Sequence, residues 1–372
     1  MKQSMNNNLT NIEENPQLLD LMIADMERAP QEYKPTNYWE YKAKFFLPAL
    51  TKEGLKDFRR KSASVFSSFG GVDVWPKYWF DLRKSRLFNN RIFSKIPGWQ
   101  TVLQTGSGII DTVIKALAPG LIRNKVLIPY KVAKDVEKKY SAPAIDKIEA
   151  SLVANPEYVF QVNGKNYTNN FVDYYIRYAY CCQFVDFSQI KIIVELGSGS
   201  CKLTEVIKKY HPEITFLNFD IAPQLYVGEM YLRSVFPGDV VSYEQNRGLT
   251  SLPALEAGKM YFFGAWQFPI LKDFSYDLFM NLTSFQEMEP DIVANYIGFI
   301  NGNSQYVYLH EQMAGKEVAQ NKGDFGVMKP TVLQDYIKNF SKYDLIDKIP
   351  SIKETGELKW VGHMDTFWKR KE

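Results

Sequence analysis

Short apolar runs alternate with amphipathic segments through the second half of the chain. In the segment CKLTEVIKKY, helical spacing places Leu203, Val206, Ile207 and Tyr210 on one face. The apolar runs that predict strands occupy residues 190–196, 214–220, 259–266, 276–285, 305–312, 343–349 and 363–369. Strands that alternate with helices are typical of an α/β fold, with a mostly parallel sheet covered by helices on both faces. We therefore predict one α/β domain over residues 161–372.

The first part of the chain has a different pattern. Apolar residues recur at helical spacing over residues 16–30, 37–61 and 131–154, whereas residues 69–127 are irregular. Prolines at positions 30, 35 and 48 predict that the first two of these stretches form short, interrupted helices. Residues 1–160 are therefore expected to form a mainly helical extension that covers the site of the α/β domain.

Two Gly-Ser-Gly sequences are candidates for a ligand-binding loop. Gly106 to Gly108 follow a short, partly polar run, which favours a simple turn before a helix. Gly197 to Gly199 instead join a buried strand to an amphipathic helix, which is the context that a nucleotide-binding loop requires. Glycines there let the backbone approach a ligand closely. The second loop is therefore the predicted site.

The residues around this loop separate the ligand classes. A dinucleotide fingerprint requires a third glycine where this chain has Lys202, and no P-loop sequence is present. Glu195 would repel a pyrophosphate but would attract an ammonium or sulfonium group. Asp220 ends the next strand, where a carboxylate can accept both hydroxyls of a ribose. These residues favour a cationic nucleoside as the ligand.

Through Glu195-Leu196-Gly197-Ser198-Gly199 and Asp220, the sequence resembles the class I methyltransferases that use S-adenosyl-L-methionine (SAM). The resemblance implies a Rossmann-like sheet of seven strands, six parallel and one antiparallel. It also implies that Gly197, Ser198 and Gly199 hold the methionine moiety and that Asp220 binds the ribose.

A narrower resemblance comes from the segments NYWEYKAKFFLPAL, EGLKDFRR, VELGSGSCKLTEVI and DLFMNLTSFQEM. Together they are similar to a family of sugar O-methyltransferases that occurs with bacterial surface-polysaccharide genes. This resemblance implies that the methyl acceptor is a hydroxyl of a sugar, either nucleotide-linked or part of a glycan precursor. Another hydroxylated metabolite, a nicotinamide-dependent oxidoreductase and a catalytically silent binding module stay open as alternatives.

A sugar hydroxyl loses its proton with difficulty at neutral pH, so a general base or a metal is expected. Glu287 follows the fourth strand of the predicted sheet and is the first candidate, although it could equally open the next helix. His310 ends the fifth strand, and His363 begins the last one. His211 follows the first helix and is expected at the surface of the opposite edge. The ends of the fourth and fifth predicted strands have no pair of aspartates that would indicate a metal site.

Further residues are predicted to contact the cofactor. Trp266 and Gln267 follow the third strand, where the resemblance places the adenine, and Asn281 lies at the end of the fourth. Before the first strand, Arg177 could pair with the carboxylate of the cofactor. Tyr174 and Tyr178 share its helix and could face the sulfonium, although they could also simply pack this helix on the sheet.

Composition limits the partners. Lysine and arginine number 45 and the acids 42, a net charge of +3, so no strong field would attract nucleic acid, and a small molecule is the expected partner. Three cysteines, two of them adjacent, form neither a disulfide framework nor a zinc motif. A polar N-terminus and the lack of a run of about eighteen apolar residues predict a cytoplasmic protein without a membrane span. A homo-oligomer is compatible with this composition.

Overall fold

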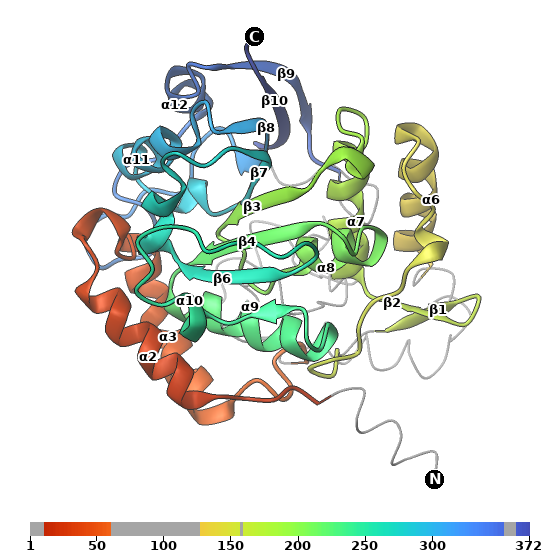
Figure 1. The fold of residues 1–372 in the computed structure, drawn as a ribbon. Coiled ribbons are helices and arrows are strands. Elements are labelled where there is room, and N and C mark those ends of the chain that lie inside the picture. Colours follow the sequence, from red (N-terminus) through yellow and green to blue (C-terminus); the bar gives the residue numbers. More distant parts are fainter. Residues whose placement is uncertain (1–10, 61–126, 157–158, 353–361) are drawn as a thin grey trace, which may run out of the picture.

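A central sheet organises the protein in the computed structural model, which describes residues 11–60, 127–156, 159–352 and 362–372 of the 372-residue chain. The sheet has eight strands in the order β5-β6-β4-β3-β7-β8-β10-β9 (Figure 1). Their bounds are β3 Ile192–Leu196, β4 Thr215–Asp220, β5 Val240–Val241, β6 Met260–Gly264, β7 Tyr276–Leu282, β8 Ser304–Gln312, β9 Tyr343–Pro350 and β10 His363–Arg370. All seven predicted strands are therefore present.

The strand directions follow the predicted arrangement. Every pairing from β5 across to β8 is parallel, and β10 runs antiparallel to both β8 and β9. Six of the predicted strands are thus parallel and the last is antiparallel. The additional strand β5 has only two residues, too few to produce a pattern in the sequence, and it extends the edge beside β6.

Helices cover both faces of the sheet. One face carries α7 Asn169–Cys181, α8 Lys202–Tyr210 and α9 Ala222–Val235, whereas α11 Pro290–Ile300, α12 Leu333–Asn339 and the 3₁₀ helix η8 Ala265–Leu271 cover the other. All residues of β4 and β6 are buried, as a strand covered on both faces requires. Smaller elements are β1 Phe160–Val162, β2 Lys165–Tyr167, η7 Phe187–Gln189, α10 Tyr243–Asn246 and η9 Phe285–Glu287.

The N-terminal part is helical, but two of its predicted boundaries are wrong. Its elements are α2 Pro16–Arg28, η1 Gln31–Tyr33, α3 Asn37–Glu53, α6 Ile128–Tyr140 and η6 Ile145–Lys147. Pro48 lies inside α3 without ending it, because the buried side chains of Phe46 and Leu50 hold both flanking turns against the core. The predicted helix to residue 154 stops at Tyr140, where Ser141 adopts a left-handed conformation.

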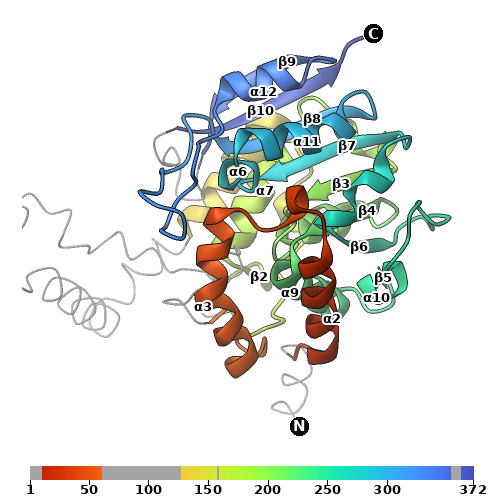
Figure 2. The same cartoon turned by 90° about the vertical axis from the view of Figure 1, so that its left-hand side faces the viewer.

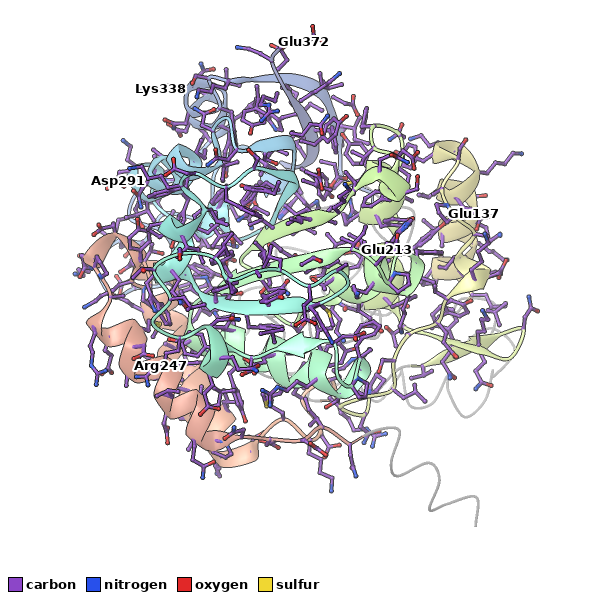
Figure 3. The ribbon with its side chains drawn as sticks, viewed as in Figure 1. Glu137, Glu213, Arg247, Asp291, Lys338 and Glu372 are labelled. Carbon is purple, nitrogen blue, oxygen red and sulfur yellow. The ribbon has the colours of Figure 1, made fainter. Side chains whose placement is uncertain are left out.

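The N-terminal helices α2 and α3 lie at the edge of the sheet toward which the parallel strands point (Figures 1 and 2). Thr36 Oγ1 donates a hydrogen bond to the carbonyl of Glu287, 2.8 Å away, just beyond β7. On α2, Asp25 receives hydrogen bonds from Tyr243 and from Arg247, whose Nη2 lies 2.8 Å from Asp25 Oδ1. Figure 3 shows Arg247 beside the N-terminal helices. This extension therefore approaches the edge where ligands bind in parallel α/β sheets.

One hydrophobic cluster contains side chains both from the N-terminal helices and from the sheet. The proposed boundary near residue 160 stays a prediction. The turn predicted at Gly106 and most of the irregular stretch 69–127 lie outside the described residues. Within those described residues, no helix is long and apolar enough to cross a membrane.

Candidate functional site

The loop after β3 has the backbone conformation that its glycines allow. Gly197 and Gly199 have φ angles of +75° and +53°, a region that disfavours residues with a side chain. The Gly197 N–H donates to the carbonyl of Phe219 at 2.8 Å, which joins the loop to the end of β4. A Cβ atom at position 197 would lie 2.2 Å from Ser284 Oγ. Glycine is thus required at position 197 both by conformation and by space.

Replacing Gly197 by alanine is expected to destabilise the protein by about 1–3 kcal/mol and to weaken cofactor binding, because the loop must move away from Ser284. Gly238→Ala is the matched control, since Gly238 has a φ of +86° but a Cβ atom added there would have no other atom within 4 Å. Chemical denaturation and calorimetric titration with S-adenosylhomocysteine would measure both effects. Equal losses in the two variants would show that backbone strain alone matters at position 197.

Asp220 is placed to bind the glycine loop and a ligand together. Its Oδ2 accepts the Gly199 N–H at 2.7 Å, and its Oδ1 accepts the Ile221 N–H at 2.8 Å. Each carboxylate oxygen has a further lone pair, so the pair of hydroxyls of a ribose can still be accepted. Burial raises the pKa of Asp220 to about 7, while the two backbone donors oppose that shift. Additional donors from a ligand would favour its ionised form.

Glu195 is a buried carboxylate beside this loop. Its side chain is 3% exposed, and Oε2 accepts a hydrogen bond of 3.0 Å from Thr204 Oγ1. Burial raises the pKa of Glu195 to about 8, and the nearby Asp220 also contributes to this rise. Tyr174 is close enough to Glu195 for the two groups to interact electrostatically. A cation placed here would favour the ionised carboxylate, and binding of a cation by Glu195 stays a prediction.

Binding of an ammonium-bearing ligand is therefore expected to tighten as the pH rises from 6 to 8. Glu195 and Asp220 have raised pKa values, so at low pH both hold protons that an ionised site must release. Affinity for S-adenosylhomocysteine should increase by up to about tenfold per pH unit for each proton released. Calorimetry in buffers of different ionisation enthalpy would count these protons. An affinity that does not change between pH 6 and 8 would contradict this coupling, and Glu195→Gln should reduce the slope.

The residues predicted near the adenine lie at the end of β6. Trp266 is half-buried and meets the ring of Tyr243 edge-to-face at 5.9 Å. Both ends of the Gln267 amide are hydrogen-bonded within the protein: Oε1 accepts the Gly264 N–H, and Nε2 donates to the Asn246 carbonyl. Contact of either residue with adenine stays a prediction, and Trp266 has the more available side chain.

Asn281 acts as a link between strands. Its Nδ2 donates to the carbonyl of Leu196 and to Ser284 Oγ, each at 2.8 Å, and its Oδ1 accepts the Phe285 N–H. The side chain is fully buried, so Asn281 can influence the cofactor site only by fixing the position of the glycine loop. Shortly after it, Thr283 has a φ of +67°, which is strained for a β-branched residue, and such strain clusters at functional sites.

Glu287 lies in η9 and does not open α11, whose N-cap is Glu289. Lys316 Nζ lies 3.2 Å from Glu287 Oε1, and Tyr38 of α3 is close enough to this carboxylate to interact with it electrostatically. Burial raises the pKa of Glu287, against the opposing influence of Lys316. Its role as base or substrate contact stays a prediction. Tyr38 was missed by sequence reasoning, because only the tertiary fold brings α3 to this edge.

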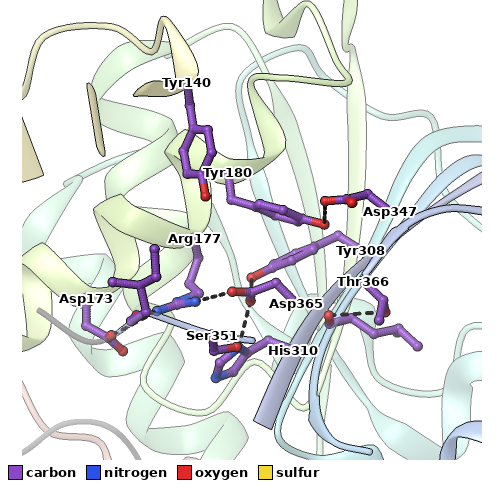
Figure 4. A network of polar contacts seen from close by, with 12 residues as sticks. Tyr140, Asp173, Arg177, Tyr180, Tyr308, His310, Asp347, Ser351, Asp365 and Thr366 are labelled. Carbon is purple, nitrogen blue, oxygen red and sulfur yellow. Dashed lines mark hydrogen bonds and ion pairs between the residues drawn. The ribbon is translucent and has the colours of Figure 1, made fainter. Parts of the chain in front are cut away.

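His310 and His363 lie at the same edge, as predicted from an antiparallel last strand. The register pairs His363 with Gln312 and His310 with Asp365, and the two imidazole centroids are 5.7 Å apart. His310 is 2% exposed, and its Nδ1 lies 2.8 Å from Asp365 Oδ1 (Figure 4). No local signal pointed to Asp365, which sits within the strand pattern of the last apolar run.

Arg177 is almost fully buried and bonds to Asp365, to Asp173 and to the carbonyl of Ile352. Burial disfavours its charge, but the two aspartates outweigh this effect and raise the pKa of Arg177. A contact with a cofactor carboxylate stays a prediction, although much of the guanidinium is already engaged by the protein.

Of the two possibilities for Tyr178, the structure agrees with packing of its helix and not with a side chain that faces the cofactor. Its hydroxyl lies 2.8 Å from His211 Nε2, and its ring stacks on Tyr210 at the opposite edge of the sheet. Tyr178 is four residues after Tyr174 on α7, and over these residues the helix moves about 6 Å away from the site. His211 is at the predicted edge, but it is half-buried against Phe187 rather than at the surface.

Lys202, which replaces the third glycine of a dinucleotide fingerprint, turns into the protein. Its Nζ lies 3.3 Å from the ring centroid of Tyr231 and 3.7 Å from Glu205 Oε2, and the residue is 2% exposed. Lys202 of α8 therefore packs against α9.

Among the described residues, no group of three His, Cys, Asp or Glu side chains could hold a metal.

No protein-family model and no curated protein sequence matches this chain. Solved structures do show similarity. Mitomycin 7-O-methyltransferase MmcR has a TM-score of 0.34 and 11% identity over 53% of this chain and 57% of its own. The pyocyanin biosynthetic protein PhzM has the same TM-score and 12% identity over 51% of this chain and 53% of its own.

A third similar structure is magnesium protoporphyrin IX methyltransferase (ChlM) from Synechocystis PCC 6803 with bound SAM. It has a TM-score of 0.34 and 9% identity over 57% of this chain and 86% of its own. This chain thus matches little more than half the length of MmcR and PhzM. At these scores the similarities carry no argument about activity, and the fold assignment depends on the strand order of the chain itself.

Proposed function

We propose that this protein is a SAM-dependent O-methyltransferase. The observation that carries the proposal is the arrangement of Glu195, the glycine loop and Asp220 at one edge of the sheet, with Gly199 hydrogen-bonded to Asp220. These groups suit an amino-acid end with an ammonium group and a ribose, and the acidic side chains disfavour a phosphate. When bound, SAM supplies an electrophilic methyl group on a sulfonium.

Each residue would have a distinct task in this site. Glu195 would attract the cationic end of the ligand, the backbone at Gly197 and Gly199 would allow its close approach, and Asp220 would accept the ribose hydroxyls. Because Glu195 and Asp220 are buried and hydrogen-bonded, their oxygens are already oriented before the ligand arrives. Such preorganisation lowers the entropic cost of binding.

A sugar hydroxyl is the acceptor that we favour. Two segments that carry the resemblance to sugar O-methyltransferases, NYWEY and SFQEM, are far apart in the sequence but adjacent in the fold. Lys316 Nζ lies 4.8 Å from the ring centroid of Tyr38 in the first segment and 3.2 Å from Glu287 Oε1 in the second, so it connects the two beside α3. Aromatic, acidic and basic side chains at one strand edge suit a polar, hydroxyl-rich molecule. The cytoplasm, where such precursors are made, is the location that fits this function.

Two measurements test this function. S-adenosylhomocysteine should stabilise the protein against heat, whereas NAD(H) should not, and stabilisation by NAD(H) alone would favour the oxidoreductase alternative. Labelled methyl transfer from SAM should then be detected with a panel of nucleotide-linked sugars and other hydroxylated metabolites. Binding of S-adenosylhomocysteine without transfer to any acceptor would favour the catalytically silent module.

A further inference from the structure

A buried polar network connects the last strand, β10, to β8 and to α7 (Figure 4). At its centre, Asp365 of β10 accepts hydrogen bonds at Oδ1 from His310 Nδ1 at 2.8 Å and from Tyr308 at 2.7 Å. The other oxygen, Oδ2, bonds to Arg177 of α7. These four residues are each at most 2% exposed, so their interactions are shielded from water.

The charge of Asp365 decides which nitrogen of His310 carries a proton. Burial opposes ionisation, but the charge of Arg177 outweighs it and holds the pKa of Asp365 well below its usual range. An ionised carboxylate can only accept hydrogen bonds, so His310 Nδ1 must be the donor. Ser351 Oγ lies 3.0 Å from the same nitrogen and is within reach of that N–H as well. In neutral His310, Nε2 therefore has the basic lone pair.

The register of the sheet shows where the His310–Asp365 pair lies relative to Glu195 of the proposed site. In the sheet, Glu195 is opposite Met280 and His310 is opposite Leu282, two residues further along β7. Side chains alternate between faces, so Glu195 and His310 are on the same face of the sheet. Two strand spacings and two residues of rise separate their Cα atoms by about 12 Å. Both residues therefore lie on the face of the sheet that α7 covers, near the carboxyl ends of their parallel strands.

We propose that Asp365 is a positioning residue that holds His310 with Nδ1 protonated, so that His310 Nε2 accepts the proton of the acceptor hydroxyl. This assignment rests on the proposed methyltransferase function. As the hydroxyl oxygen forms its bond to the methyl carbon, the carbon–sulfur bond breaks, sulfur keeps that electron pair, and the hydroxyl proton moves to Nε2. The resulting imidazolium faces the carboxylate of Asp365, which stabilises its charge. Arg177 keeps that carboxylate ionised and oriented.

The tautomer of His310 can be measured without any ligand. The chain has only three histidines, so long-range ¹H–¹⁵N spectra of the whole protein can be assigned with His211→Gln and His363→Gln variants. Neutral His310 is expected as the Nδ1–H tautomer. In Asp365→Asn, the amide oxygen should stay with Arg177 and the NH₂ should face His310, which would move the proton to Nε2. Asp347→Asn is the control, because Asp347 bonds to Tyr180 but not to His310.

An Nε2–H tautomer in the unaltered protein would overturn the proposal, even if Asp365→Asn fails to fold. Measurements of kcat and of ligand affinity distinguish a positioning role of Asp365 from a merely structural one. With the best acceptor, Asp365→Asn should lower kcat by about 10²- to 10⁴-fold while the Kd of S-adenosylhomocysteine changes less than about twofold. An unchanged kcat would also overturn the proposal. If the unaltered protein does not bind S-adenosylhomocysteine, the methyltransferase function fails instead, whatever the tautomer.

Discussion

Substituting glutamine for His310 is expected to lower the rate of methyl transfer by about 10²- to 10⁴-fold, the usual contribution of a positioned general base. Glutamine keeps a polar side chain of similar length but cannot take up a proton at neutral pH. The affinity for S-adenosylhomocysteine should change little, because His310 is about two strand spacings from the glycine loop. Labelled methyl transfer and calorimetric titration would measure the two effects separately.

His211→Gln is the matched control for this variant. His211 is also partly buried and hydrogen-bonded, to Tyr178, but it lies at the opposite edge of the sheet. Methyl transfer by His211→Gln should therefore stay close to that of the unaltered protein. If both variants lose activity equally, the effect comes from general destabilisation and His310 is not the base. Should only Glu287→Gln or His363→Gln lose activity, one of those residues takes that role.

Alanine at position 220 is expected to weaken binding of S-adenosylhomocysteine by about 5- to 150-fold, which corresponds to about 1–3 kcal/mol. The substitution removes the carboxylate that would accept the ribose hydroxyls. It also leaves the N–H groups of Gly199 and Ile221 without their acceptor, so the glycine loop loses a support. Calorimetric titration at pH 8, where the carboxylate is ionised, would give the largest difference.

Asp277 offers a close control for Asp220. Its Oδ2 accepts two backbone N–H groups, from Lys191 at 2.7 Å and from Ile192 at 2.8 Å, but at the opposite end of β3. Asp277→Ala should thus cost similar backbone hydrogen bonds without any effect on ligand affinity. An affinity of Asp220→Ala that equals that of Asp277→Ala would show that Asp220 does not touch the ligand.

The N-terminal extension is part of the same edge. Asn37 at the start of α3 donates to the carbonyls of Asp324 and Gly326 and accepts the Gly323 N–H. The segment 313–330, a long loop after β8, is therefore attached to α3 by specific hydrogen bonds. Movement of this segment would require α3 to move or these bonds to break.

The strands, and the position of Glu195, the glycine loop and Asp220 at one edge of the sheet, could be predicted from the amino-acid pattern. Continuous apolar runs mark the buried parallel strands, and the strand, glycine and helix order identifies the loop at Gly197. Glu195 and Asp220 were found for the same reason, because each is placed by its own strand. Such signals are local and depend only on spacing along the chain.

The partners of those residues emerged only from the folded arrangement of the chain. Asp365 and Arg177 are 188 residues apart in the sequence, yet they share one buried ion pair. Tyr38 meets Glu287 because α3 crosses the strand edge, and Tyr178 turns away from the site because its helix runs toward the opposite edge. Contacts of this kind depend on how whole elements pack, and no periodic pattern in the sequence encodes that packing.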